Sequence, residues 1–60
     1  LKKGQGVKIE EWIVYDQSEG KISTTTGTIQ GYEDEYNGYI KVKLDCGNVL
    51  SFNSHELTCI

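Results

Sequence analysis

The chain has 60 residues, of which 37% are hydrophobic, and a formal net charge of -3. A chain of this length forms one domain that buries only about 60% of its unfolded surface, which excludes a deep pocket between two layers. It contains no arginine, and this lack together with the acidic balance disfavours nucleic-acid binding. Without a membrane-span-like apolar run or a signal-peptide pattern, we expect a soluble cytoplasmic protein with a single domain over residues 1–60.

The first predicted elements are a strand and a long connection. Residues 6–10 alternate in polarity and predict a short strand with Val7 and Ile9 facing inward. Residues 12–15 are apolar throughout, which favours an extended arm, and the β-branched residues that follow disfavour helix. We therefore expect a long irregular hairpin over residues 11–25.

The second predicted strand covers residues 27–32. Ile29 has the inward parity, and Gly27 and Gly31 share it. Glycines at these positions leave space for close approach of another strand or for a sharp bend. An acidic stretch follows and ends in Asn37-Gly38, a dipeptide typical of hairpin turns.

The clearest strand covers residues 39–44. Ile40, Val42 and Leu44 alternate with polar or aromatic residues, which is the period of a half-buried strand. A tight turn is predicted over residues 45–48, because a glycine in its third place suits a positive φ.

The chain then returns and closes. Leu50 and Phe52 are the apolar pair of the returning strand. Residues 53–57 contain polar side chains that can cap a single helical or 3₁₀ turn, after which Leu57 points back to the core. Residues 58–60 are predicted to form a last short strand.

This order of motifs resembles a known family of folds. V-x-I, a long loop, G-T-I-x-G-Y, Y-I-x-V-x-L-D-x-G and L-x-F-x-x-x-E-L follow one another from Val7 to Ile60. The pattern is similar to KOW-type and short bacterial or prophage-encoded SH3-like proteins. The resemblance implies an all-β fold, a small five-stranded SH3-like barrel with a long first loop and a 3₁₀ turn before the last strand. A groove for proline-rich peptides is not expected, because the tandem tryptophan of such grooves is absent.

Residues with catalytic or metal-binding chemistry are few. His55 is the only histidine, and its spacing from Cys46 and Cys59 does not support a nucleophile and base pair. The two cysteines lack the spacing of a zinc or redox site, so free thiols are expected. The acidic run at residues 33–35 lacks the alternating ligands of a calcium loop. We predict that the protein is not an enzyme and carries no metal or cofactor.

Exposed aromatic residues beside acidic residues are the best candidate for a contact surface. Aromatic side chains are enriched at protein interfaces, and the acidic run suits a basic partner. Alternatively, the aromatic residues close the ends of the barrel and the acidic run is a solvated loop tip. The candidate partner-binding residues are Trp12, Tyr15, Tyr32, Glu33, Asp34, Glu35, Tyr36 and Tyr39.

Two functions are compatible with these residues. The first is a non-enzymatic protein-binding module, such as a phage or prophage accessory or inhibitor protein that occupies a partner's surface. The second is a KOW-like nucleic-acid or ribosome-binding module that uses Lys8, Lys21, Lys41 and Lys43. Formation of a homo-oligomer through an uncovered sheet edge is compatible with either. No role in a membrane is expected.

Overall fold

The computed structural model describes residues 1–34 and 38–60, and most of the regular secondary structure in these residues is antiparallel β-sheet. The elements in chain order are β1 (Gly6–Ile9), α1 (Glu11–Gln17), β2 (Thr26–Asp34), β3 (Tyr39–Leu44), β4 (Val49–Asn53), the 3₁₀ helix η1 (Ser54–Glu56) and β5 (Leu57–Cys59). The strand order in the sheet is β4-β3-β2-β1-β5. The predicted all-β class, with five antiparallel strands and a 3₁₀ turn before the last strand, is confirmed.

The core forms where the alternating residues of the strands face inward. On β3, Ile40, Val42 and Leu44 are buried and the residues between them are exposed, as the sequence pattern predicts. Val7 and Ile9 on β1 are buried in the same way. The core consists of Val7, Ile9, Ile13, Val14, Ile29, Ile40, Val42, Leu44, Phe52 and Leu57.

The sheet bends strongly along β2, and two glycines mark the bend. At Gly27 a Cβ atom would lie only 2.5 Å from the Lys43 carbonyl oxygen, so only glycine allows β3 to approach this closely. At Gly31 the register with β3 shifts after Ile29, and the φ angle is 155°. The bulge reverses the alternation, so Gly31 pairs with the exposed Lys41 and does not keep the predicted inward parity.

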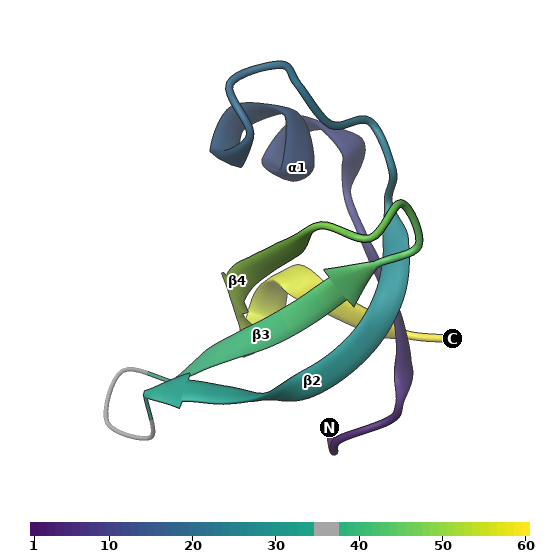
Figure 1. Ribbon diagram of the computed structural model, residues 1–60. Coiled ribbons are helices and arrows are strands. Elements are labelled where there is room, and N and C mark those ends of the chain that lie inside the picture. The colour runs from purple at the N-terminus through teal and green to yellow at the C-terminus, as the bar shows by residue number, and fades with distance from the viewer. Residues whose placement is uncertain (35–37) are drawn as a thin grey trace.

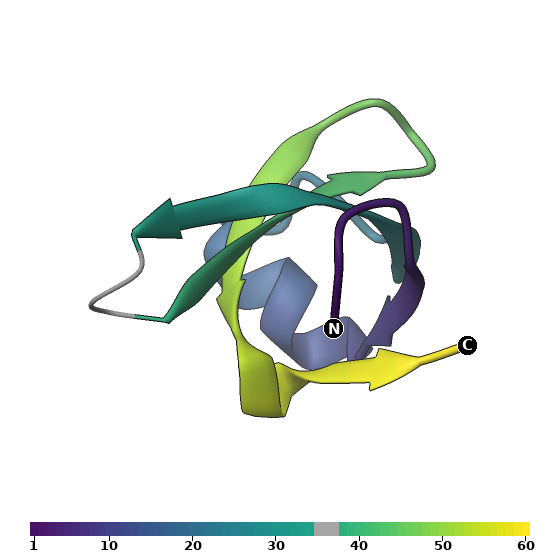
Figure 2. The ribbon, with the colours of Figure 1, turned by 90° about the horizontal axis from the view of Figure 1, so that it is seen from below.

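The two ends of the sheet are joined by η1. Figure 2 shows the sheet, seen from below, bent around on itself, with η1 between β4 and β5. Within the described residues β4 and β5 are the outer strands, and they are not paired with each other. The Asn53 backbone N–H donates a hydrogen bond to Glu56 Oε1 (2.9 Å) at the start of η1. Leu57 follows and is buried, as predicted.

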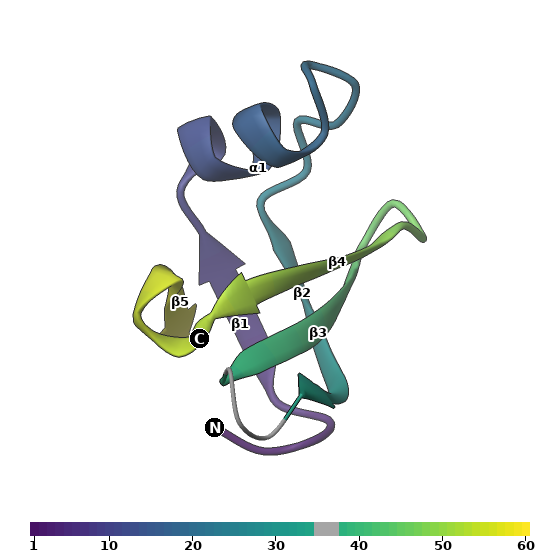
Figure 3. The same cartoon turned by 90° about the vertical axis from the view of Figure 1, so that its left-hand side faces the viewer.

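The connection after β1 contains a helix, so the predicted extended hairpin over residues 11–25 is wrong. Glu11–Gln17 forms α1, and Ile13 and Val14 are buried in the core. At the end of the helix, Gln17 Nε2 donates a hydrogen bond to the Ser51 carbonyl oxygen (2.6 Å). Figures 1 and 3 both show α1 at the top of the molecule, at the opposite end from the tip of β2 and β3. Packing of two adjacent apolar residues therefore overrides their β-branched preference for extended backbone.

The chain leaves α1 through a tight reversal. Gly20 has a φ of 80°, and its N–H donates a hydrogen bond to the Tyr15 carbonyl oxygen (2.8 Å). Ser18 Oγ accepts a hydrogen bond from the Ile22 N–H (3.0 Å), which ties the following segment to the helix end. A glycine with positive φ just after a helix is a common stop signal. The reversal returns the chain to β2 beside β1.

Candidate functional site

The outward side of α1 carries the most exposed aromatic pair on the described surface. Ile13 and Val14 face the core, so the residues on either side of them in the helical repeat face solvent. Trp12 is 65% exposed and Tyr15 is 61% exposed. Together with Glu11 and Asp16 they line a shallow hollow. We call these four residues the α1 surface.

Both aromatic rings are held in place by neighbouring groups. The Trp12 indole Nε1–H donates a hydrogen bond to Glu10 Oε2. The Tyr15 ring packs against the backbone of Gly20, where an added Cβ would lie 3.1 Å from Tyr15 Cζ. Each ring therefore has a neighbouring contact within the chain, although both rings are largely exposed.

A second hollow lies on the other side of Trp12. It brings together residues from the start of α1, from η1 and from β5. Its lining residues are Glu10, Trp12, Ile13, His55, Glu56 and Thr58. Trp12 lines both hollows, so this side chain is the centre of a continuous acidic and aromatic region.

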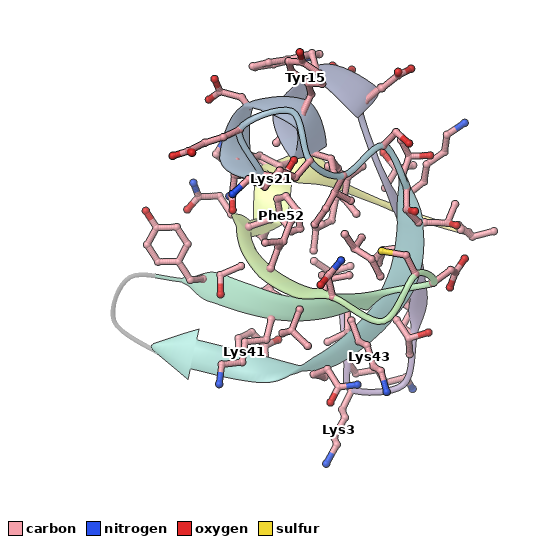
Figure 4. The ribbon with its side chains drawn as sticks, turned by 45° about the horizontal axis from the view of Figure 1, so that its top comes forward. Lys3, Tyr15, Lys21, Lys41, Lys43 and Phe52 are labelled. Atoms are coloured by element: carbon pink, nitrogen blue, oxygen red, sulfur yellow. The ribbon has the colours of Figure 1, made fainter. Side chains whose placement is uncertain are left out.

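The lysines are divided between two sides of the molecule. Lys41 and Lys43 are exposed on the outer face of β3. Figure 4 shows both of them with Lys3 on the opposite side from Tyr15, whereas Lys21 lies towards the α1 end. The structure therefore does not gather the predicted lysine set, and it brings Lys3, which the sequence did not single out, to the side of Lys41 and Lys43.

The remaining predicted aromatic residues lie away from the α1 surface. Tyr32 on β2 is 55% exposed, and its hydroxyl donates a hydrogen bond to the Leu1 carbonyl oxygen (3.1 Å). Tyr39 begins β3 and is exposed. Tyr32 lies near the end of β2 and Tyr39 at the start of β3, and these ends of the two strands lie opposite α1 in Figures 1 and 3. The exposed aromatic residues thus form two groups.

The structure describes only part of the predicted acidic run. Glu33 and Asp34 are the last two residues of β2. Glu35 and Tyr36 lie outside the described residues. The acidic residues that accompany exposed aromatic side chains in the structure are instead Glu11 and Asp16.

Groups with chemical reactivity are sparse in the described part of the chain. No three His, Cys, Asp or Glu side chains among the described residues are placed to hold a metal ion. His55 is exposed on η1, and Cys46 and Cys59 are exposed free thiols. The pKa of the Cys46 thiol is lowered by hydrogen bonds, first from the Asn48 backbone and then from the Thr24 side chain. Neither α1 nor η1 is long and apolar enough to span a membrane.

Glu11 and Asp16 are the site residues that sequence reasoning missed. The helical repeat is the sequence signal that could have found them, because residues 11, 12, 15 and 16 lie on one side of the segment when it is helical. Assigning this segment as extended separates them.

A scan of protein-family models, a search of curated proteins and a search of solved structures each found no match to this chain.

Proposed function

We propose that this chain is a small protein-binding module of the SH3-like type that acts by occupying the surface of a protein partner through α1. The observation that carries the proposal is the exposure of Trp12 and Tyr15 side by side on one helix face. Occupation of a partner needs a contact surface and no catalytic group. This mode of action suits a phage or prophage accessory or inhibitor protein.

The strand arrangement supports the SH3-like part of the proposal. Five strands, the long connection between β1 and β2, and η1 before β5 are the features that the sequence resemblance implies. The strong bend of β2 brings β1 and β5 to the same side as η1. In this arrangement α1 occupies the long first loop.

The energetics of the aromatic pair favour a binding role. The ten core side chains form a continuous cluster that includes Ile13 and Val14 of α1, so Trp12 and Tyr15 are not needed to complete it. Tryptophan and tyrosine are enriched among the residues that dominate binding energy at protein interfaces. The hydrogen bond of Trp12 and the contact of Tyr15 with Gly20 restrict the rings before binding, which lowers the cost of ordering them.

The surrounding charges indicate the kind of partner. Glu10, Glu11 and Asp16 lie beside the aromatic pair, and no lysine is among the residues that line either hollow. Complementary charge steers association and selects partners. We therefore expect a partner with a basic surface.

The test is affinity capture with matched variants. Tagged wild-type protein, the double variant Trp12→Ala/Tyr15→Ala and the control Tyr32→Ala are incubated with lysate of the source cells after nuclease treatment. The expected result is one protein retained by the wild type and by Tyr32→Ala and lost by the double variant. The affinity of the double variant for the purified partner should be at least about 30-fold lower than that of the wild type, as for an interface centred on aromatic residues. Equal affinity of all three proteins contradicts the proposal.

A nucleic-acid-binding role is the second candidate, and the grouping of lysines favours it. Lys3, Lys41 and Lys43 lie on one side of the molecule, away from the acidic α1 surface. Binding through them would release counterions and depend steeply on salt. The variant Lys41→Gln/Lys43→Gln should then abolish capture of RNA or DNA while the α1 double variant retains it. The reverse pattern supports the protein-binding role.

A further inference from the structure

The hollow on the α1 surface combines two kinds of side chain. Trp12 and Tyr15 supply aromatic rings, and Glu11 and Asp16 supply carboxylates. The four residues lie at one side of two successive helical turns, so the rings and the carboxylates are neighbours. No lysine lines the hollow. Its chemistry is therefore suited to a cation with an apolar face.

The hollow is formed before any ligand binds. Trp12 is held by its hydrogen bond to Glu10, and Tyr15 is held by its packing on Gly20. The positive φ of Gly20 and its close contact with the Tyr15 ring both favour glycine at residue 20. A preformed arrangement of rings and charges reduces the cost of ordering on binding.

Among natural side chains, arginine matches these features best. Its guanidinium group is planar, stacks on aromatic faces and donates paired hydrogen bonds to carboxylates. A lysine ammonium is more strongly hydrated and lacks the planar face, and a neutral group leaves the carboxylates without a counter-charge. Anionic groups are repelled by Glu11 and Asp16.

We propose that the α1 surface receives an arginine side chain of the protein partner, stacked against the aromatic rings and hydrogen-bonded to Glu11 or Asp16. The inference rests on the proposed function, because it names the group that the protein-binding surface recognises. It adds a requirement that a general hydrophobic contact does not have. The partner must present an arginine side chain, and the positive charge of that side chain must contribute to the affinity.

The experiment is an NMR titration with blocked single-residue probes. Trp12 is the only tryptophan, so its indole N–H signal is assigned without ambiguity, and the variants described below assign a shift to the hollow of the α1 surface. N-acetyl-arginine-N-methylamide is compared with the lysine and citrulline analogues; citrulline has nearly the shape of arginine but no charge. We expect arginine to shift the Trp12 signal with a dissociation constant on the order of millimolar, and citrulline to bind about tenfold more weakly. Equal binding of arginine and citrulline, or no shift with arginine, overturns the inference.

Two variants assign the charge effect to the hollow. Glu11→Gln/Asp16→Asn should weaken arginine binding about 3- to 10-fold and leave citrulline binding unchanged, since only the charged pair is lost. Glu19→Gln is the matched control, because Glu19 is an exposed carboxylate near the helix that does not line the hollow. Glu19→Gln removes one charge and the double variant removes two, so a loss of binding free energy with Glu19→Gln that is half that of the double variant, or larger, means that net charge, and not this hollow, is responsible, which overturns the inference.

The same variants separate this inference from the proposed function. A partner that depends on Trp12 and Tyr15 but binds equally to Glu11→Gln/Asp16→Asn leaves the protein-binding role intact and removes the arginine site. Arginine binding in the titration, combined with a partner that ignores Trp12 and Tyr15, keeps the arginine site and removes the protein-binding role for this surface.

Discussion

Phe52 and Trp12, the only phenylalanine and the only tryptophan of the chain, occupy opposite environments. Phe52 on β4 is fully buried at the centre of the core, whereas Trp12 on α1 is 65% exposed. Both are large aromatic side chains, so the difference lies in the element that carries them. On β4 the alternation of the strand directs Phe52 inward, and on α1 the helical repeat directs Ile13 and Val14 inward and Trp12 outward.

The comparison separates the residues that stabilise the protein from those that are available for binding. A 60-residue chain has little stability to spare, so large aromatic surface left exposed is surface that folding has not used. We expect substitutions around Phe52 to act on the free energy of unfolding. We expect substitutions on the α1 surface to act on binding alone.

The largest expected effect is that of Phe52→Ala. Removing a fully buried phenylalanine costs about 3–5 kcal/mol, which approaches the whole stability of a small domain. We expect largely unfolded protein at 37 °C, measured by circular dichroism during thermal unfolding. The conservative variant Phe52→Leu should stay folded with a lower midpoint. If Phe52→Ala unfolds at the wild-type temperature, the core described here is wrong.

Gly27→Ala tests the close contact between β2 and β3. The new Cβ would lie 2.5 Å from the Lys43 carbonyl oxygen and 2.9 Å from Leu44 Cα, so the strands must move apart. We expect a loss of about 1–3 kcal/mol in the free energy of unfolding, measured in urea. The control is Gly6→Ala, where no atom lies within 4 Å of the added Cβ. Equal destabilisation by the two substitutions would show that the approach of β3 is not the cause.

Trp12→Ala/Tyr15→Ala should have little effect on stability. Both side chains are mostly exposed, and exposed substitutions change the free energy of unfolding by about 0.5 kcal/mol or less. Urea unfolding of the variant should therefore overlay that of the wild type even though partner binding is lost. A loss comparable to that of Gly27→Ala would mean that the α1 surface is part of the fold, and the comparison with Phe52 would fail.

The Cys46 thiol provides a reporter that lies outside both regions. Hydrogen bonds from Asn48 and Thr24 favour its thiolate and lower its pKa, so in a Cys59→Ser background alkylation should reach its half-maximal rate at a lower pH in folded than in urea-unfolded protein. Thr24→Val should move this midpoint upward. The α1 double variant should keep the folded midpoint. If the folded and unfolded midpoints coincide, the turn does not hold the thiol as described.

Much of the sheet is predictable from sequence because its strands alternate. The buried Ile40, Val42 and Leu44 follow from residue parity alone, and Gly27 follows from the need for space. The parity of Gly31 fails because a bulge inserts one residue into β2, and a bulge leaves no distinct signal in a strand that already contains glycine.

The candidate site is only partly predictable, and the reason lies in α1. Four consecutive apolar residues have neither a strand nor a helix period, so the sequence pattern does not distinguish a helix from a strand in this segment. Trp12 and Tyr15 can be named one by one as exposed aromatic residues. Their association with Glu11 and Asp16 depends on the helical turn, which tertiary packing of Ile13 and Val14 stabilises.

In the sequence α1 lies between β1 and β2, which pair with each other, and this position determines which sequence changes the segment can accept. β1 and β2 are held together where the helix leaves and returns: Lys8 pairs with Thr26, and the Ile9 N–H donates a hydrogen bond to the Thr25 carbonyl oxygen (2.8 Å). The sheet thus fixes both ends of the intervening segment, much as a scaffold fixes a recognition loop. An exchanged segment that still supplies two apolar side chains in place of Ile13 and Val14 could carry a different outer face, so new binding specificities can be selected without redesign of the sheet.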